Sequence, residues 1–150
     1  MKFLVQNIDK MQNVVDKFLK DNNIDVKANI ILANRNPRAC WYRNISPTGK
    51  DIFFIEFNDS NWISFNQGNN AESILNTLIH ECLHHLAYHR KLKFNDGDYD
   101  FEKLLFEYGA DSNYEDTDLE DIDNRFLDFE LYNRRENFIK TKNKYLKLLL

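Results

Sequence analysis

The sequence predicts an α+β fold, in which a small antiparallel or mixed sheet packs against a central helix, with further helices at both ends of the chain. Apolar residues recur every three or four positions over residues 4–20 and again over 71–89, which is the period of a helix with one buried face. Between them, residues 26–57 are rich in β-branched and aromatic residues, as strands are. With 150 residues and no internal repeat, the chain fits a single domain over 1–150.

The first half of the chain predicts one helix and three clear strands. The helix over residues 4–20 ends at Asp21-Asn22-Asn23, which is turn chemistry. Short turns containing Pro or Gly separate the strands, and such connections favour antiparallel pairing. The predicted strands are 26–32, 38–43 and 51–57, and a weaker edge strand is predicted over 62–65.

The second half predicts two helices, an acidic loop and a C-terminal helix. The helix over 71–89 carries a wide apolar stripe and should be the central one. A short helix over 101–108 should stop at Gly109. Residues 111–123 hold seven carboxylates in thirteen positions and predict a solvated loop. A last helix is expected over about 124–150, so that the core covers about 1–112.

Composition narrows the class of protein. The net charge of −4 argues against a non-specific nucleic-acid binder. No segment reaches the roughly 20 apolar residues that a membrane span needs, and polar residues interrupt the apolar N-terminus, unlike a signal peptide. Two distant cysteines, Cys40 and Cys82, form no disulfide framework. We therefore expect a cytoplasmic protein without a membrane partner, and no pattern specifies an oligomeric state.

The central helix contains the motif HExxH, as His80-Glu81-Cys82-Leu83-His84. Residues four apart on a helix differ by about 40° in direction, so both imidazoles can reach one zinc ion. Glu81 lies beside that ion without ligating it and suits the general base for zinc-activated water. The expected reaction is hydrolysis of a peptide bond, with Glu81 as the catalytic residue and Zn²⁺ as the cofactor.

His85 and His89 form a second pair with the same spacing on this helix. In that register no carboxylate takes the position of the base. We therefore interpret this pair as supporting residues. Aromatic residues near the predicted sheet edge, Trp41, Tyr42 and Trp62, could line a groove for a peptide, although core packing is the simpler interpretation.

The order of these elements resembles the SprT-like (Spartan-type) zinc metalloprotease domain, a minimal HExxH metallopeptidase of zincin-like fold. In that family a small sheet precedes a helix bearing TLxHExxH, here Thr77 to His84, and a short helix ending at a Gly-containing turn follows, here residues 101–109. The resemblance covers roughly residues 24–112. It implies that the loop after the motif helix supplies a third zinc ligand.

This chain departs from the family pattern at the third ligand. The family usually has a histidine there, whereas this loop reads Asp96-Gly97-Asp98-Tyr99-Asp100 and contains no histidine. Asp98 lies fourteen residues after His84, close to the family spacing, and a carboxylate is a sound zinc ligand. We therefore predict His80, His84 and Asp98 as the metal ligands. The alternatives for the third ligand are Asp100, Asp96, Glu102 and Glu107.

Two functions follow from this pattern. The first is a zinc-dependent endopeptidase acting on a protein or peptide. The second is a non-catalytic module for protein or nucleic-acid binding on the same fold. Resemblance alone suggests DNA-associated protein substrates. The basic C-terminal segment, with Arg134, Arg135 and four lysines, allows a nucleic-acid contact but fits better as a solvated helix docked through Phe138, Tyr145 and Leu149.

Overall fold

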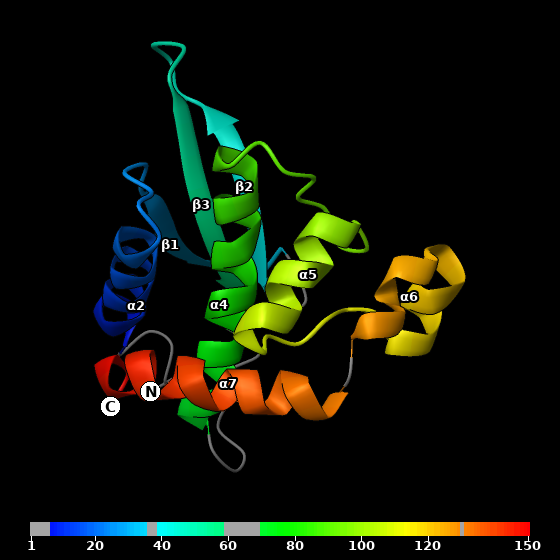
Figure 1. Cartoon of the computed structure of the whole chain (residues 1–150). Helices are drawn as coiled ribbons and strands as arrows, with labels where there is room; N and C mark the ends of the chain where they lie inside the picture. The colour runs from blue at the N-terminus through cyan, green and yellow to red at the C-terminus, as the bar shows by residue number, and fades with distance from the viewer. Residues whose placement is uncertain (1–6, 36–38, 59–69, 130) are drawn as a thin grey trace.

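The predicted α+β class is confirmed. The computed structural model describes residues 7–35, 39–58, 70–129 and 131–150. A three-stranded mixed sheet packs against the helix that carries His80, Glu81 and His84, and further helices lie at both ends of the chain (Figure 1). The expected edge strand at 62–65 lies outside the described residues.

The sheet is formed by β1 (Ala28–Ala33), β2 (Ala39–Ile45) and β3 (Asp51–Asn58) in the order β1-β3-β2. The hairpin of β2 and β3 is antiparallel, as expected, but β1 pairs parallel to β3. Residues 34–38 therefore connect two strands that are not neighbours. A short turn thus did not imply that the strands it joins are paired.

Helix α2 (Ile8–Asp21) covers the β1 side of the sheet and closes part of its edge. The side-chain amide of Gln12 donates to the Ala28 carbonyl at 2.9 Å and accepts from the Ile30 N–H at 2.8 Å. This amide pairs with β1 as the backbone of a neighbouring strand would. The apolar face of α2 is fully or almost fully buried and consists of Met11, Val14, Val15, Phe18 and Leu19.

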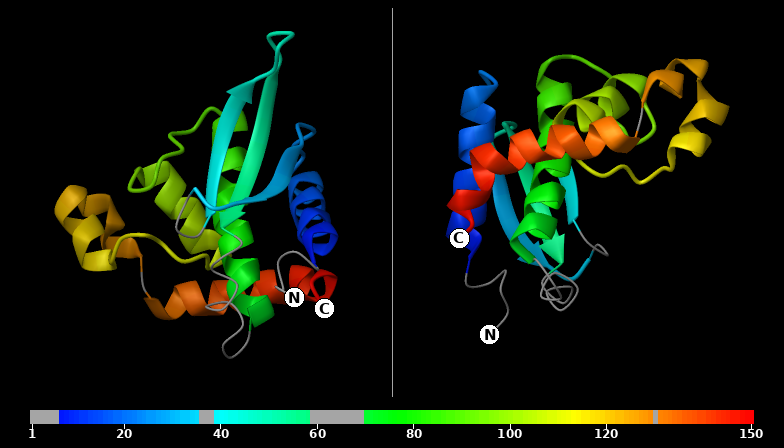
Figure 2. Two further views of the ribbon diagram at one scale, coloured as in Figure 1. Left: turned by 180° about the vertical axis from the view of Figure 1, so that it is seen from behind. Right: turned by 60° about the horizontal axis from the view of Figure 1, so that its bottom comes forward.

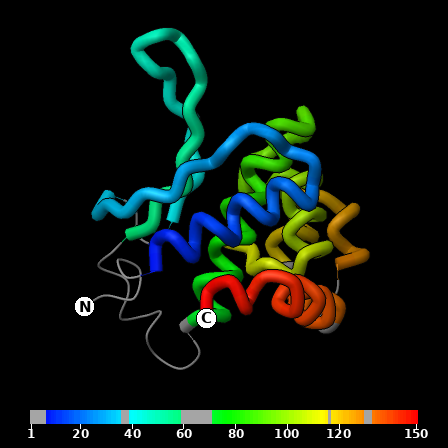
Figure 3. The backbone as a smooth tube through the Cα atoms, turned by 90° about the vertical axis from the view of Figure 1, so that its left-hand side faces the viewer, coloured from blue at the N-terminus to red at the C-terminus, as the bar shows by residue number. Residues whose placement is uncertain are grey.

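Helix α4 (Asn70–His89) is central, with α2 on one side and α5 (Tyr99–Tyr108) on the other (Figure 1). Residues Phe53, Ile55 and Phe57 alternate along β3 and point into the core that α4 covers. The turn of the β2–β3 hairpin rises away from the helices (Figure 3). Gly109 ends α5 with φ +71°, which confirms the predicted stop.

The acidic segment is more ordered than the predicted loop. It contains α6 (Asp116–Ile122), followed by the 3-10 helix η2 (Asn124–Asp128). A capping box between Glu115 and Asp118 starts α6. A small separate core of Leu119, Phe126 and Phe129 then holds the segment against α5. The sequence did not indicate this helix, because most of its residues are charged and only a few apolar side chains hold it against α5.

Helix α7 (Leu131–Tyr145) and the 3-10 helix η3 (Leu146–Leu148) close the molecule on one side (Figure 2). The helix starts later than expected, because η2 comes first. Tyr145 and Leu149 are buried in the main core, so α7 belongs to the core rather than extending from it. No helix within the described ranges is both long and apolar enough to cross a membrane.

Candidate metal centre

His80, Glu81 and His84 lie together on one face of α4, where they form a cluster that could hold a metal ion. One ligand atom from each of the three lies within 4.8 Å of the other two. All three residues are buried, with 7 to 8% of their surface exposed. The helical spacing places the two imidazoles one turn apart, as the sequence predicts.

Both histidines use one ring nitrogen to hold a backbone carbonyl. His80 Nδ1 lies 2.6 Å from the carbonyl oxygen of Asp111, and His84 Nδ1 lies 2.5 Å from that of Phe94. A carbonyl only accepts hydrogen bonds, so each Nδ1 must carry a proton. In the neutral imidazoles, each Nε2 then has a free lone pair. This is how proteins fix the tautomer of a metal-binding histidine.

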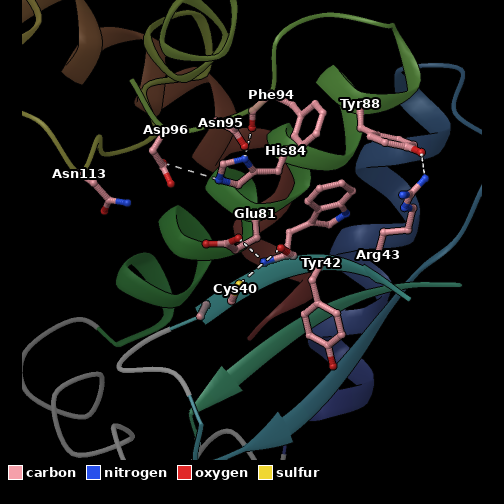
Figure 4. Close-up of a pocket in the computed structure, with 12 residues that line it drawn as sticks. Cys40, Tyr42, Arg43, Glu81, His84, Tyr88, Phe94, Asn95, Asp96 and Asn113 are labelled. Atoms are coloured by element: carbon pink, nitrogen blue, oxygen red, sulfur yellow. Dashed lines mark hydrogen bonds and ion pairs between the residues drawn. The ribbon is translucent and has the colours of Figure 1, made fainter. Parts of the chain in front are cut away.

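The two Nε2 atoms converge on the same carboxylate oxygen. Asp96 Oδ1 lies 3.0 Å from His80 Nε2. It also lies 3.6 Å from His84 Nε2, a contact drawn in Figure 4. Three atoms that can all accept a hydrogen bond therefore face one another. Such an arrangement is unfavourable unless a proton or a cation lies between them.

The charge balance of the metal-free cluster also favours a cation. Burial lowers the pKa of His80, but the hydrogen bond to Asp96 and the charge of Glu81 outweigh it, so its pKa lies above the ordinary 6.5. Burial and the charge of His80 lower the pKa of His84 to about 4. Burial raises the pKa of Glu81 to about 7. The site thus stabilises one positive charge among its nitrogen and oxygen atoms.

Glu81 is held by the edge strand of the sheet. Its Oε2 accepts a hydrogen bond from the backbone N–H of Trp41 in β2 at 2.7 Å. The indole N–H of Trp41 donates in turn to Nδ1 of His85 at 3.0 Å, which ties β2 to α4. Glu81 therefore has a fixed position beside the histidine pair without bridging it. No pattern in the sequence indicates this role of Trp41.

A cavity of about 630 Å³ opens beside the cluster (Figure 4). Glu81, His84 and Asp96 form its polar end, and Asn113 lines it near Asp96. Burial alone would raise the pKa of Asp96, but the hydrogen bond from His80, the charges of the two histidines and a hydrogen bond from Asn113 lower it. A group bound by the two histidines and Asp96 would thus be open to a ligand entering from this cavity. Sequence reasoning did not identify Asn113.

The structure places Asp96, rather than the predicted Asp98, at the histidine pair. Gly97 has φ +89° and turns the chain between them. Asp98 lies at the N-cap position of α5 and its Oδ2 accepts from the N–H of Asn95 at 3.0 Å. It lines a different pocket together with Asp100. Glu107, another alternative ligand, is exposed on α5.

Glu102, the remaining alternative, is fully buried and connects two loops. Its Oε2 accepts from the N–H of Gly97 at 3.2 Å, and its Oε1 accepts from the hydroxyl of Ser112. Gly97 directly follows Asp96, and Ser112 directly follows Asp111. Glu102 therefore fixes the two segments that provide Asp96 and the carbonyl for His80.

The segment that holds His80 is also fixed by α7. Asp111 N–H donates to Asn76 Oδ1 at 2.8 Å, and buried Arg134 donates to the carbonyl of Ala110 at 2.8 Å. A Cβ at Gly109 would lie 2.1 Å from the backbone nitrogen of Phe138, so the two backbones are in contact there. Support for the candidate site thus extends to the C-terminal helix.

The chain matches no protein-family model, and no curated protein or solved structure is significantly similar to it. The resemblance to SprT-like domains therefore rests on the HExxH cluster and the order of the elements. What the molecule itself provides is a buried His-Glu-His group with an adjacent aspartate.

Proposed function

We propose that the protein is a zinc-dependent peptidase in which His80, His84 and Asp96 hold the metal and Glu81 is the general base. The observation that carries this proposal is the convergence of the Nε2 atoms of both histidines on one oxygen of Asp96. Asp96, an alternative to the predicted Asp98, is the third ligand in this proposal because of that contact.

The donor set fits zinc. Two imidazole nitrogens and one carboxylate are a common ligand set for catalytic zinc, which keeps a fourth position open. The Nδ1 hydrogen bonds to the carbonyls of Asp111 and Phe94 provide the outer contacts that orient such ligands. Magnesium and calcium prefer oxygen ligands, so a nitrogen-rich site argues against them.

Zinc held by these residues would polarise a substrate carbonyl and acidify a bound water. Glu81 would accept the proton, because its carboxylate lies beside the histidines and the Trp41 N–H keeps it in place. A proton acceptor works best when its pKa is near the working pH. The burial that raises the pKa of Glu81 acts in that direction.

The structure offers more support for binding a peptide in the cavity than for binding DNA through the basic helix α7. The cavity beside the cluster is lined by aromatic and polar side chains from β2, α4 and the following loop. On α7, Arg134 is buried, and Lys142 pairs with Glu72 at 3.0 Å, so part of the basic charge is used within the molecule. Action on DNA-associated protein has the support of the family resemblance only.

Metal content of matched variants tests the ligand set. We expect purified wild-type protein to bind one zinc ion, measured by elemental analysis and chelator competition. Asp96→Ala should weaken zinc binding strongly, while Asp98→Ala, a matched aspartate two residues away, should bind nearly as wild type does. The reverse result would restore Asp98 as the ligand. Absence of zinc binding by the wild type would reject the metal proposal.

Glu81→Gln separates catalysis from binding. This variant keeps the shape of the side chain but removes the proton acceptor, so zinc should remain bound while cleavage of an unfolded protein falls by roughly 10²- to 10⁴-fold. If the zinc-loaded wild type cleaves no unfolded protein or peptide, the non-catalytic binding module becomes the better description.

A further inference from the structure

The cavity beside the candidate metal centre has a second, apolar end. Beyond Glu81 and His84, its walls include the rings of Trp41, Tyr88 and Phe94, which come from β2, α4 and the loop after α4. Figure 4 shows Tyr88 and Phe94 at this end. The three rings contact one another, with centroids 5.3 to 5.6 Å apart. They form one continuous aromatic wall.

The polar atoms of this wall are already paired. The indole N–H of Trp41 donates to His85, and the hydroxyl of Tyr88 accepts from Arg43 Nη1 at 2.9 Å. The carbonyl of Phe94 is held by His84. These residues therefore contact a ligand mainly through the apolar surface of their rings. Apart from the proton of the Tyr88 hydroxyl, these three side chains offer a polar ligand group no hydrogen-bond partner, so most such groups would lose hydration without compensation.

The wall begins directly at a candidate metal ligand. The ring of Trp41 is nearly parallel to that of His84, at 14°, with centroids 6.2 Å apart. The backbone of Trp41 also holds Glu81. A substrate whose carbonyl lies at the histidines and Glu81 therefore has its neighbouring side chain within reach of the wall.

Charge around the cavity disfavours an acidic side chain. Glu81 and Asp96 lie at the metal end. Among the described residues that line the cavity, Arg43 is the only lysine or arginine, and it is engaged by Tyr88 and lies 3.8 Å from Asp51. Its side chain is about half exposed, at 48%, so it is also well solvated. An incoming carboxylate would gain little from it.

We propose that this aromatic wall is the subsite for a large apolar side chain, preferably aromatic, next to the scissile bond of the substrate. The inference rests on the proposed function and adds a substrate class to it. Burying a ring against Trp41, Tyr88 and Phe94 gains the transfer free energy of its surface and favourable edge or stacked ring contacts. Relative to a methyl side chain, this corresponds to roughly 10- to 100-fold tighter binding.

Three hydroxamates test this proposal by direct binding. The probes are the hydroxamates of acetyl-phenylalanine, acetyl-alanine and acetyl-aspartate, whose common group chelates zinc. Calorimetry on the zinc-loaded protein should give a Kd for the phenylalanine probe about 10- to 100-fold below that for alanine, with aspartate weakest. Equal affinities for phenylalanine and alanine would overturn the subsite.

Two tyrosine variants assign the preference to the wall. Tyr88→Ala should reduce the phenylalanine-to-alanine ratio to nearly 1. Tyr99→Ala is the matched control, because Tyr99 is also half-buried and also lies against an arginine, Arg125, but lines a different pocket. It should leave the ratio unchanged. An unchanged ratio in Tyr88→Ala would contradict the proposal.

Folding and metal loading are measured for each variant first. If Tyr88→Ala does not fold, Tyr88→Leu keeps apolar volume without the ring and should lower the ratio several-fold. Zinc content of the wild type separates the two proposals. Absence of zinc rejects the proposed function, whereas bound zinc with no side-chain preference rejects the subsite alone.

Discussion

Helix α4 carries two histidine pairs with the same spacing, and they have different surroundings. His80 and His84 each give one nitrogen to a carbonyl and direct the other toward Asp96. His85 accepts from the Trp41 indole and donates to the carbonyl of Val26 at 2.7 Å, so both its nitrogens are occupied. His89 packs edge-on against Phe53 at 4.8 Å.

The difference shows that spacing alone does not make a metal site. Both pairs can place two imidazoles on one helix face. In the His80 and His84 pair, the hydrogen bonds leave two lone pairs beside a carboxylate. For His85, they leave none, and burial lowers its pKa to about 4. A neutral His85 joins α4 to the sheet. The Nε2 atoms of His80 and His84 instead face Asp96, where a cation could bind.

Removing a ligand from the first pair should have the largest effect. We expect His80→Ala or His84→Ala to weaken zinc binding by at least about 10³-fold, because each removes one of three protein donors. His85→Ala should leave zinc affinity within a few-fold of wild type. Chelator competition measures all three, and a large loss in His85→Ala would contradict the comparison.

His85→Ala should instead destabilise the zinc-free fold by about 2–4 kcal/mol. It creates a cavity and leaves the Trp41 indole N–H and the Val26 carbonyl without their partner. Urea unfolding of the zinc-free protein measures the change. His89→Ala is the control, because His89 makes no hydrogen bond to another described side chain or backbone group, and it should cost less.

Glu102→Ala should weaken zinc binding by roughly 10- to 100-fold, as loss of an outer contact does. The variant releases the loops that follow Asp96 and Asp111. Glu102→Gln should stay within a few-fold, because an amide can accept from Gly97 and donate to Ser112. Glu107→Ala, on the exposed side of the same helix, should have no effect. An unchanged zinc affinity in Glu102→Ala would show that the two loops keep their positions without Glu102.

Zinc affinity should also decrease as the pH is lowered, and the pH at which the decrease begins should identify His80 as a ligand. Its pKa lies above 6.5 in the metal-free protein, so zinc must displace a proton once the pH drops below that pKa. Affinity should then fall by up to about tenfold per pH unit. His84, with a pKa of about 4, should add to the loss only near that pH. A constant affinity from pH 8 to 5 would argue against His80 as a ligand.

Local patterns in the sequence were enough to predict α4, α5, the three strands and the His80 to His84 group. They could not predict that β1 is parallel to β3, because non-neighbouring strands are paired by long-range contacts. Nor could they choose between Asp96 and Asp98. That choice depends on the positive φ of Gly97 and on Asn95, which engages Asp98. The role of Glu102 depends likewise on contacts with two separate loops.

The amide of Gln12 has a consequence for self-association. An outer strand with unpaired N–H and C=O groups invites a strand from another molecule, which leads to aggregation. By bonding Ala28 and Ile30, Gln12 denies those two positions on β1 to an incoming chain. One uncharged side chain in α2 thus disfavours intermolecular sheet growth at the edge of the sheet opposite β2.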